Sequence, residues 1–169
     1  NAEAITLSGQ VSIRWIENKM NAYLNKLLQS QDIDYVIASD TDSIYLNLGP
    51  LVDKFFSNKS SDKARIVALL DKICQDKLEP FIDSSYEELA AYVSAYDQKM
   101  IMKRENIADR GIWTAKKRYI LNVWDSEGVR YKEPKMKIMG LETARSSTPA
   151  YFRDKLYAAF QIIIGKTND

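Results

Sequence analysis

Residues 35–48 constrain the fold more than any other stretch, because two short apolar runs flank an acidic segment. The first run is Tyr35-Val36-Ile37-Ala38, and apolar and polar side chains alternate through the second run, residues 43–48. Alternation with period two is typical of a strand that buries one face, and a short polar segment between two such runs is typical of a hairpin turn. The stretch therefore predicts a β-hairpin with Asp40-Thr41-Asp42 at or beside its turn.

Helical spacing of apolar residues recurs on both sides of this hairpin. Apolar residues three or four apart predict helices within residues 2–28, 66–73, 86–93 and 152–163. Gly49-Pro50 is expected to end the hairpin, and Pro80 is expected to kink or break the chain between the second and third helices. The last helix should begin after Ser147-Thr148-Pro149. Its expected apolar face consists of Phe152, Leu156, Phe160 and Ile163.

Strand-like runs fill much of the remaining chain. They are residues 100–102, 118–124, 129–131 and 135–139. Asp125-Ser126-Glu127-Gly128 supplies turn chemistry between two of these runs. The order is helix, hairpin, helices, strands and helix, which predicts an α+β fold with a mostly antiparallel sheet covered by helices.

The chain contains no His and a single Cys, Cys74. The absence of His excludes His-based triads and most zinc sites. A bound metal would be held by carboxylates and carbonyls, which favours a hard ion such as magnesium, manganese or calcium. One Cys excludes an internal disulfide and fits a reducing compartment. No apolar run approaches the roughly 20 residues of a membrane span, so no membrane partner is expected.

Asp40 and Asp42 are the first candidate site. Side chains at positions i and i+2 of a strand share a face, so the two carboxylates can converge on one ion near the end of the hairpin. Mutual repulsion would raise one pKa unless a cation neutralised it. An ordinary polar turn explains the same residues, and the pair alone does not decide between the two.

A basic segment is the second candidate. Residues 99–137 carry eleven Lys and Arg against five Asp and Glu, a local charge of +6 in a chain of net charge +1. Within it, Lys116, Lys117 and Arg118 lie among Trp113, Tyr119 and Trp124 on a predicted strand. Cations neutralise phosphates and aromatic rings stack on bases or sugars, so the segment suits nucleic acid. An edge strand guarded by lysines against aggregation explains it equally well.

Taken together and in this order, four stretches resemble the family B DNA polymerases, most closely the replicative polymerases of T-even-type phages. "SDTDSIY" is similar to motif C, usually Tyr-Gly-Asp-Thr-Asp-Ser, and "TAKKRY" is similar to the Lys-Lys-Arg-Tyr element that holds the primer–template duplex. "AITLSGQVSIRWIENKMNAYLN" resembles the helix before motif C. "LNVWDSEGVRYKEPKMKIMGLETARSSTP" resembles the stretch that joins palm and thumb.

The resemblance implies roles for particular residues. Asp42 corresponds to the aspartate that ligates both catalytic magnesium ions, and Asp40 to its neighbour, which ligates less directly. Glu105, in "MKREN", matches a glutamate close to the metals. The duplex-holding residues are Lys116, Lys117, Arg118 and Tyr119. The sequence departs from the family at Ala38-Ser39, where Tyr-Gly is usual, and at Lys103, where an acidic residue is usual.

The resemblance also implies that motif A, motif B and the fingers lie outside this chain. Residues 1–145 are expected to form the C-terminal part of the palm, and residues 146–169 the start of the thumb. The implied cofactor is Mg²⁺, for which Mn²⁺ can substitute. The implied partners are primer–template DNA, deoxynucleoside triphosphates and the upstream polymerase segment, in the host-cell cytoplasm. The isolated chain is expected to be inactive.

Two other functions remain open at this point. A sugar-nucleotide glycosyltransferase uses an Asp-x-Asp at a strand end to bind manganese and a diphosphate, which explains the hairpin but not the Lys-Lys-Arg-Tyr stretch. A non-catalytic nucleic-acid-binding module is the third possibility.

Overall fold

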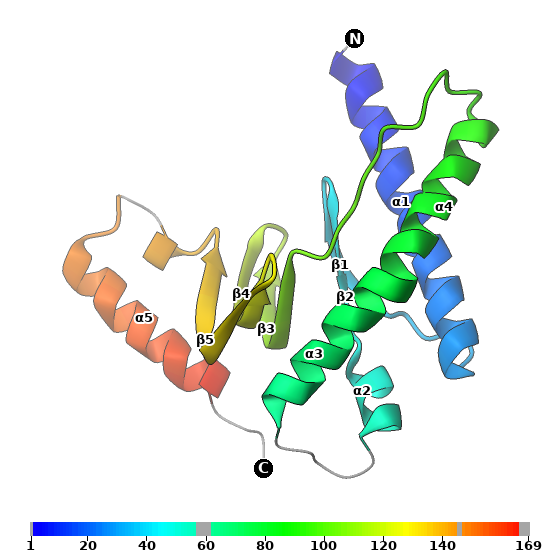
Figure 1. Ribbon diagram of the computed structural model, residues 1–169. Coiled ribbons are helices and arrows are strands. Elements are labelled where there is room, and N and C mark those ends of the chain that lie inside the picture. Colours follow the sequence, from blue (N-terminus) through cyan, green and yellow to red (C-terminus); the bar gives the residue numbers. More distant parts are fainter. Residues whose placement is uncertain (1, 57–61, 145–146, 166–169) are drawn as a thin grey trace. The chain divides into compact units, whose positions relative to one another are not determined.

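The computed structural model describes residues 2–56, 62–144 and 147–165 (Figure 1). The chain divides into two compact units, Asn1–Arg104 and Glu105–Asp169. Both combine helices with antiparallel strands, so the predicted α+β class is confirmed. The strands form two separate sheets of two and three strands. The expected domain boundary between residues 145 and 146 lies outside the described residues.

The first unit is built on a long helix. Its elements are α1 (Ala2–Leu28), β1 (Val36–Asp40), β2 (Ser43–Leu46), α2 (Gly49–Phe55), α3 (Lys63–Ile73), the π-helical turn η1 (Cys74–Leu78) and α4 (Glu79–Tyr92). Ile16, Met20 and Leu24 recur every four residues on α1 and are fully buried. They pack in one core with residues of η1 and α4, beside which α1 runs in Figure 1. The helix predicted within residues 2–28 is confirmed.

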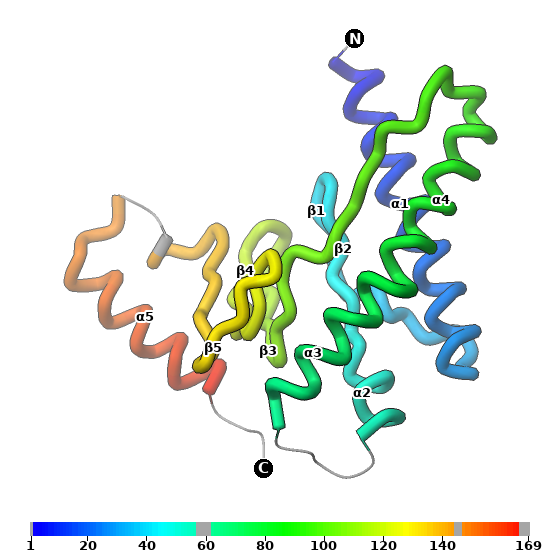
Figure 2. Tube along the Cα trace, viewed as in Figure 1, coloured from blue at the N-terminus to red at the C-terminus, as the bar shows by residue number. Residues whose placement is uncertain are grey.

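The predicted hairpin is also confirmed. β1 and β2 pair antiparallel with Asp40 opposite Ser43, and Figure 2 traces their tight reversal in cyan. Ile44, Leu46 and Leu48 pack against the core of the unit, as the alternation of the sequence predicts. The core thus holds one face of the hairpin and leaves its turn at the surface.

Gly49-Pro50 follows the end of the hairpin, as predicted, whereas Pro80 does not break the helix. Gly49-Pro50 begins α2, with the proline in the first turn, where its missing N–H has no intrahelical partner. Pro80 also lies in a first turn, that of α4, and α3, η1 and α4 run on without a break (Figure 1). The π-helical turn before Pro80 makes the hydrogen-bond ladder irregular there, so a residue without an N–H is accommodated.

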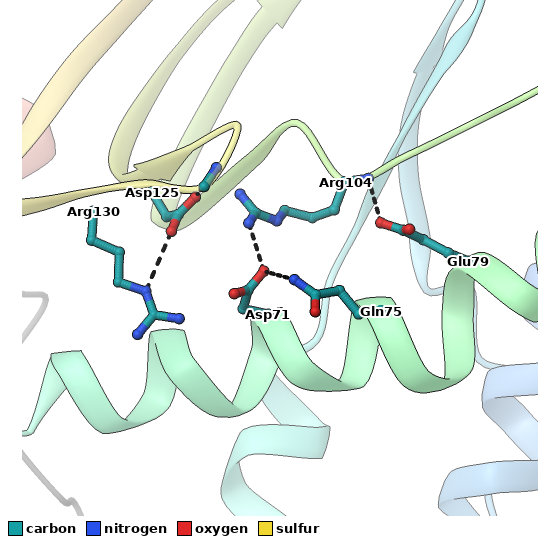
Figure 3. A network of polar contacts seen from close by, with 7 residues as sticks. Asp71, Gln75, Glu79, Arg104, Asp125 and Arg130 are labelled. Atoms are coloured by element: carbon teal, nitrogen blue, oxygen red, sulfur yellow. Dashed lines mark hydrogen bonds and ion pairs between the residues drawn. The ribbon is translucent and has the colours of Figure 1, made fainter.

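The strand predicted at residues 100–102 is wrong, because this stretch is irregular. Polar contacts with the helices hold its end instead (Figure 3). Arg104 Nη2 lies 2.6 Å from Asp71 Oδ1, and both side chains are largely buried. The same carboxylate oxygen accepts a 3.1 Å hydrogen bond from Gln75 Nε2, and the Arg104 main-chain N–H donates to Glu79 Oε1 at 3.1 Å. The segment after α4 is therefore bound both to α3, through Asp71, and to α4, through Glu79.

The second unit is a three-stranded sheet with one helix. Its elements are β3 (Asn106–Ala115), β4 (Arg118–Ser126), β5 (Val129–Met139), the 3₁₀ turn η2 (Glu142–Ala144) and α5 (Ala150–Gly165). The strand order is β3-β4-β5 and all pairs are antiparallel. Ile120, Leu141 and Ile164 form the buried cluster between the sheet and α5.

The strand at residues 118–124 and the turn after Asp125 are confirmed. Asp125 is fully buried, accepts a 3.0 Å hydrogen bond from Gly128 N, and lies 3.5 Å from Arg130 Nε (Figure 3). The two short runs predicted at residues 129–131 and 135–139 are one strand, β5. Its register is irregular around Pro134, which an edge strand tolerates.

Two further expectations are corrected. β3 was not predicted, because Asp109, Arg110 and Gly111 interrupt any strand-like pattern. On α5, Leu156 and Phe160 point inward but Phe152 and Ile163 are more than half exposed. Ile164, four residues after Phe160, is the buried residue of this face. Among the described helices, none is both long and apolar enough to cross a bilayer.

Candidate functional site

The paired aspartates lie at the tip of the β1–β2 hairpin. Asp40 is the last residue of β1 and is half-buried, whereas Asp42 is exposed in the turn. Thr41 Oγ1 donates to Asp40 Oδ1 at 3.0 Å, and Ser43 Oγ donates to the Asp40 main-chain oxygen at 3.3 Å. The short turn therefore brings the two carboxylates into one small region, although Asp42 does not continue the strand.

The chemistry of this pair suits a hard divalent cation. Magnesium is usually held by one or two carboxylates together with water and substrate phosphates, rather than by a full protein cage. Within residues 2–56, 62–144 and 147–165, no group of three or more acidic, Cys or His side chains is arranged to hold a metal. Asp40 and Asp42 therefore fit a partial ligand set that other groups would complete.

Asparagine side chains on α1 hold the start of the strand that carries Asp40. Asn21 Oδ1 accepts hydrogen bonds from Tyr35 N at 2.8 Å and Val36 N at 3.0 Å, and Asn21 Nδ2 donates to Asp34 Oδ1 at 2.7 Å. Because Val36 begins β1, these bonds fix the origin of the hairpin to the buried helix.

Asn25, one helical turn later, holds the loop before the strand. Its Nδ2 donates to Ile33 O at 2.7 Å, and its Oδ1 accepts from Ile33 N at 3.1 Å and from Ser30 Oγ at 2.9 Å. Neither asparagine was among the residues predicted from the sequence to matter for the site. The available signal was two Asn residues four apart inside a helix, a position where Asn is unfavourable unless its side chain has a partner.

Replacing Asn21 by Ala is expected to lower the free energy of unfolding by about 2 kcal/mol, because Tyr35 N loses this acceptor and Val36 N keeps only its longer hydrogen bond to Asp34 Oδ1. Urea denaturation followed by circular dichroism measures this. Asn18→Ala is the matched control, because Asn18 is exposed on the same helix. Equal stability of the two variants would contradict this role of Asn21.

Glu105 lies in the second unit, directly before β3, whereas Asp40 and Asp42 lie in the first. Lys137 Nζ on β5 lies 2.8 Å from Glu105 Oε1. This hydrogen bond lowers the pKa of Glu105, so the carboxylate is ionised at neutral pH. The Glu105 main-chain oxygen also accepts a hydrogen bond from Glu127 N at 2.6 Å. Within its own unit, Glu105 is therefore an oriented carboxylate with a cationic neighbour.

Lys116, Lys117 and Arg118 were predicted to lie on one strand, but the structure places the first two in a turn. Lys116 and Lys117 connect β3 to β4, and Arg118 is the first residue of β4, opposite Ala115. Lys117 has φ +61°, in the left-handed region. Residues 116–118 include no Gly, Asn, Asp or Pro, so no residue typical of turns marks this stretch. All three cations are exposed at one end of the sheet.

Two aspects of this turn bear on its function. β4 is the central strand of its sheet. The alternative that these cations protect an edge strand against aggregation is therefore wrong for Arg118. Tyr119 is only 6% exposed and its ring lies 6.2 Å from that of Trp113. Tyr119 therefore anchors the turn, while Lys116, Lys117 and Arg118 are exposed to solvent.

Cys74 is not a reactive thiol. It is buried in the first unit, and this burial raises its pKa to about 11. A thiol with this pKa stays protonated at neutral pH and is a poor nucleophile.

Two curated proteins match the chain, and both are named DNA-directed DNA polymerase. That of Escherichia phage RB69 is 46% identical over 157 residues, which cover 88% of this chain and 17% of the phage protein. That of Enterobacteria phage T4 is 40% identical over 172 aligned residues, which cover 97% of this chain and 19% of the phage protein. The chain is a relative of a segment of the T-even-type phage DNA polymerases.

The resemblance to these phage polymerases, drawn from four motifs, is thereby confirmed. No protein-family model matches the chain. The chain spans less than a fifth of the length of either phage polymerase. The similarity covers both units, so it includes the aspartate hairpin and the cationic turn alike.

Proposed function

We propose that this chain is the part of a DNA-directed DNA polymerase that carries motif C and the duplex-holding turn. In this proposal, residues 1–145 belong to the palm and residues 146–169 to the start of the thumb of a family B enzyme. The observation that carries the proposal is the 46% identity to a phage DNA polymerase over 88% of the chain. Two features support it: the aspartate hairpin suits the binding of a divalent metal, and the exposed cationic turn suits contact with DNA phosphates.

Asp42 and Asp40 are proposed as metal-binding residues at the site of nucleotidyl transfer. Bound Mg²⁺, or Mn²⁺ in its place, would lower the pKa of the primer 3′ hydroxyl and stabilise charge on the leaving pyrophosphate. Asp42 is exposed at the tip and supplies the more accessible ligand. Asp40, whose Oδ1 accepts from Thr41 Oγ1, has less freedom and shapes the site. Glu105 is proposed as a further catalytic carboxylate of the whole enzyme.

Lys116, Lys117 and Arg118 are proposed to contact phosphates of the primer–template duplex. Their charges lie at one end of the sheet, on a turn next to the buried Tyr119, where exposed cations can contact the phosphates of a DNA backbone. Tyr119 is proposed to contact the primer side with the small part of its ring that is exposed. These contacts position the duplex and read no sequence.

The proposed partners are primer–template DNA, deoxynucleoside triphosphates and the polymerase segment that carries motif A, motif B and the fingers, in the host-cell cytoplasm. Positioning and charge stabilisation provide most of the catalysis in phosphoryl transfer. The proposal assigns the nucleotide-binding helix to the partner segment, so this chain by itself would supply only part of the positioning and of the charge stabilisation.

Primer extension tests this function. Alone, the chain is expected to extend a labelled primer at no measurable rate in magnesium. Extension should appear when polypeptides that carry the remaining palm, the fingers and the rest of the thumb are added. Rapid extension by the isolated chain would contradict the proposal that it needs the other polymerase segments for activity. A well-folded chain that never restores extension, but binds duplex DNA, would favour a non-catalytic module.

A further inference from the structure

Gly140 directly follows β5 and lies against the cationic turn. Its φ is +67°, and a Cβ at this position would lie 2.1 Å from the main-chain oxygen of Lys117. The same atom would lie 3.1 Å from the Lys117 carbonyl carbon and 3.2 Å from Arg118 Cγ. Cβ atoms do not approach main-chain atoms as closely as 2.1 Å, so no other residue fits here without moving the turn.

The register of the sheet explains this close approach. Tyr119 in β4 pairs with Met139 in β5, so the residue after Met139 reaches the turn that precedes Tyr119. On the other side, Thr114 Oγ1 donates to Arg118 O at 3.3 Å. The turn is thus held from β3 through a side chain and from the end of β5 through main-chain packing.

The turn itself is in a costly conformation. Lys117 has φ +61°, where glycine is favoured and a side chain other than Asn or Asp is strained. Strained residues persist only where the surroundings over-determine them, and they are common at functional sites. Lysine at this position keeps a cation that glycine would lose.

We propose that Gly140 is a positioning residue for DNA binding: by admitting the Lys117 carbonyl, it holds Lys116, Lys117 and Arg118 in the arrangement that meets duplex phosphates. The inference rests on the proposed DNA contact of this turn. It assigns a residue outside the Lys-Lys-Arg-Tyr stretch to the same binding surface.

Gly128 provides a matched control. It also has a positive φ, +87°, but nothing lies within 4 Å of a Cβ built on it. Gly128→Ala therefore introduces backbone strain in the same unit without touching the cationic turn. Gly140→Ala introduces backbone strain together with the clash against Lys117.

The experiment is fluorescence anisotropy of the full 169-residue chain with a short labelled DNA duplex over a range of salt concentrations, with folding checked by circular dichroism. Gly140→Ala is expected to weaken binding by about tenfold and to make the log–log salt slope shallower by about one, as when one phosphate contact is lost. Gly128→Ala should keep the wild-type slope and an affinity within about twofold. Wild-type affinity and slope in folded Gly140→Ala would overturn the inference.

A second pair of variants keeps the test decisive if Gly140→Ala does not fold. Adding Lys117→Gly frees the turn backbone, so the Lys117 carbonyl can move away from the new Cβ. The double variant should bind DNA more weakly than Lys117→Gly alone, because Lys116 and Arg118 are then displaced. Equal affinity would overturn the inference. If replacing Lys116, Lys117 and Arg118 by Ala leaves binding unchanged, the proposed DNA contact itself fails.

Discussion

Replacing Asp42 by Ala is expected to abolish magnesium-dependent primer extension in a polymerase reassembled from this chain and the remaining polymerase segments. A metal that stabilises charge in the transition state contributes several kcal/mol, so its loss corresponds to a fall in rate of roughly a thousandfold or more. Asp42 is exposed at the hairpin tip, so the variant should fold normally. Single-turnover extension of a labelled primer measures the effect.

Asp53→Ala is the matched control, because Asp53 is also exposed and lies on α2 of the same unit. It should leave extension within about twofold of wild type, since a surface charge remote from bound metal adds little. Asp40→Ala should reduce extension less than Asp42→Ala, because Asp40 is assigned the less direct ligation.

Manganese binding separates a metal defect from a folding defect. Paramagnetic broadening of backbone resonances by Mn²⁺ should centre on the hairpin in the wild-type chain and vanish in Asp42→Ala. The binding should be weak, because two carboxylates leave most ligand positions to water. Broadening that survives in Asp42→Ala, or extension that survives, would contradict the assignment of Asp42.

The hairpin was predictable because its signal is local. Alternation over residues 43–48 and a short acidic turn specify strand, face and reversal within one stretch. The core confirms this, since Ile44 and Leu46 pack inward. The positions of Asp40 and Asp42 followed from the same reasoning, whereas their use as metal ligands came from the resemblance to polymerases.

What could not be predicted depends on contacts between distant residues. The bonds from Asn21 to Tyr35 and Val36 join positions 14 and 15 residues apart, and no periodicity encodes them. The turn at Lys117 lacks the residues that mark turns, and Gly140, which packs against it, lies far along the chain. β3 was missed because Asp109 and Gly111 interrupt its pattern, and only its pairing with β4 holds it as an edge strand.

Replacing Lys116, Lys117 and Arg118 together by Ala is expected to remove most of the affinity of the chain for duplex DNA, about a hundredfold at low salt. If each cation neutralises about one phosphate, the wild-type log–log salt slope is on the order of −2 to −3, and the variant should approach zero. All three side chains are exposed at the sheet end, so the fold should persist. Anisotropy titrations at several salt concentrations measure both quantities.

The control must change the net charge equally without touching the turn. Lys54, Lys72 and Lys77 are exposed on helices of the first unit, and replacing them by Ala removes the same three charges. If long-range attraction by net charge were the whole cause of binding, both triple variants would weaken it equally. If the turn holds the duplex, only the first variant loses the salt-dependent contacts. The difference between the salt slopes of the two variants therefore counts the phosphates that the turn itself contacts. Equal slopes would show that Lys116, Lys117 and Arg118 belong to an ordinary solvated surface.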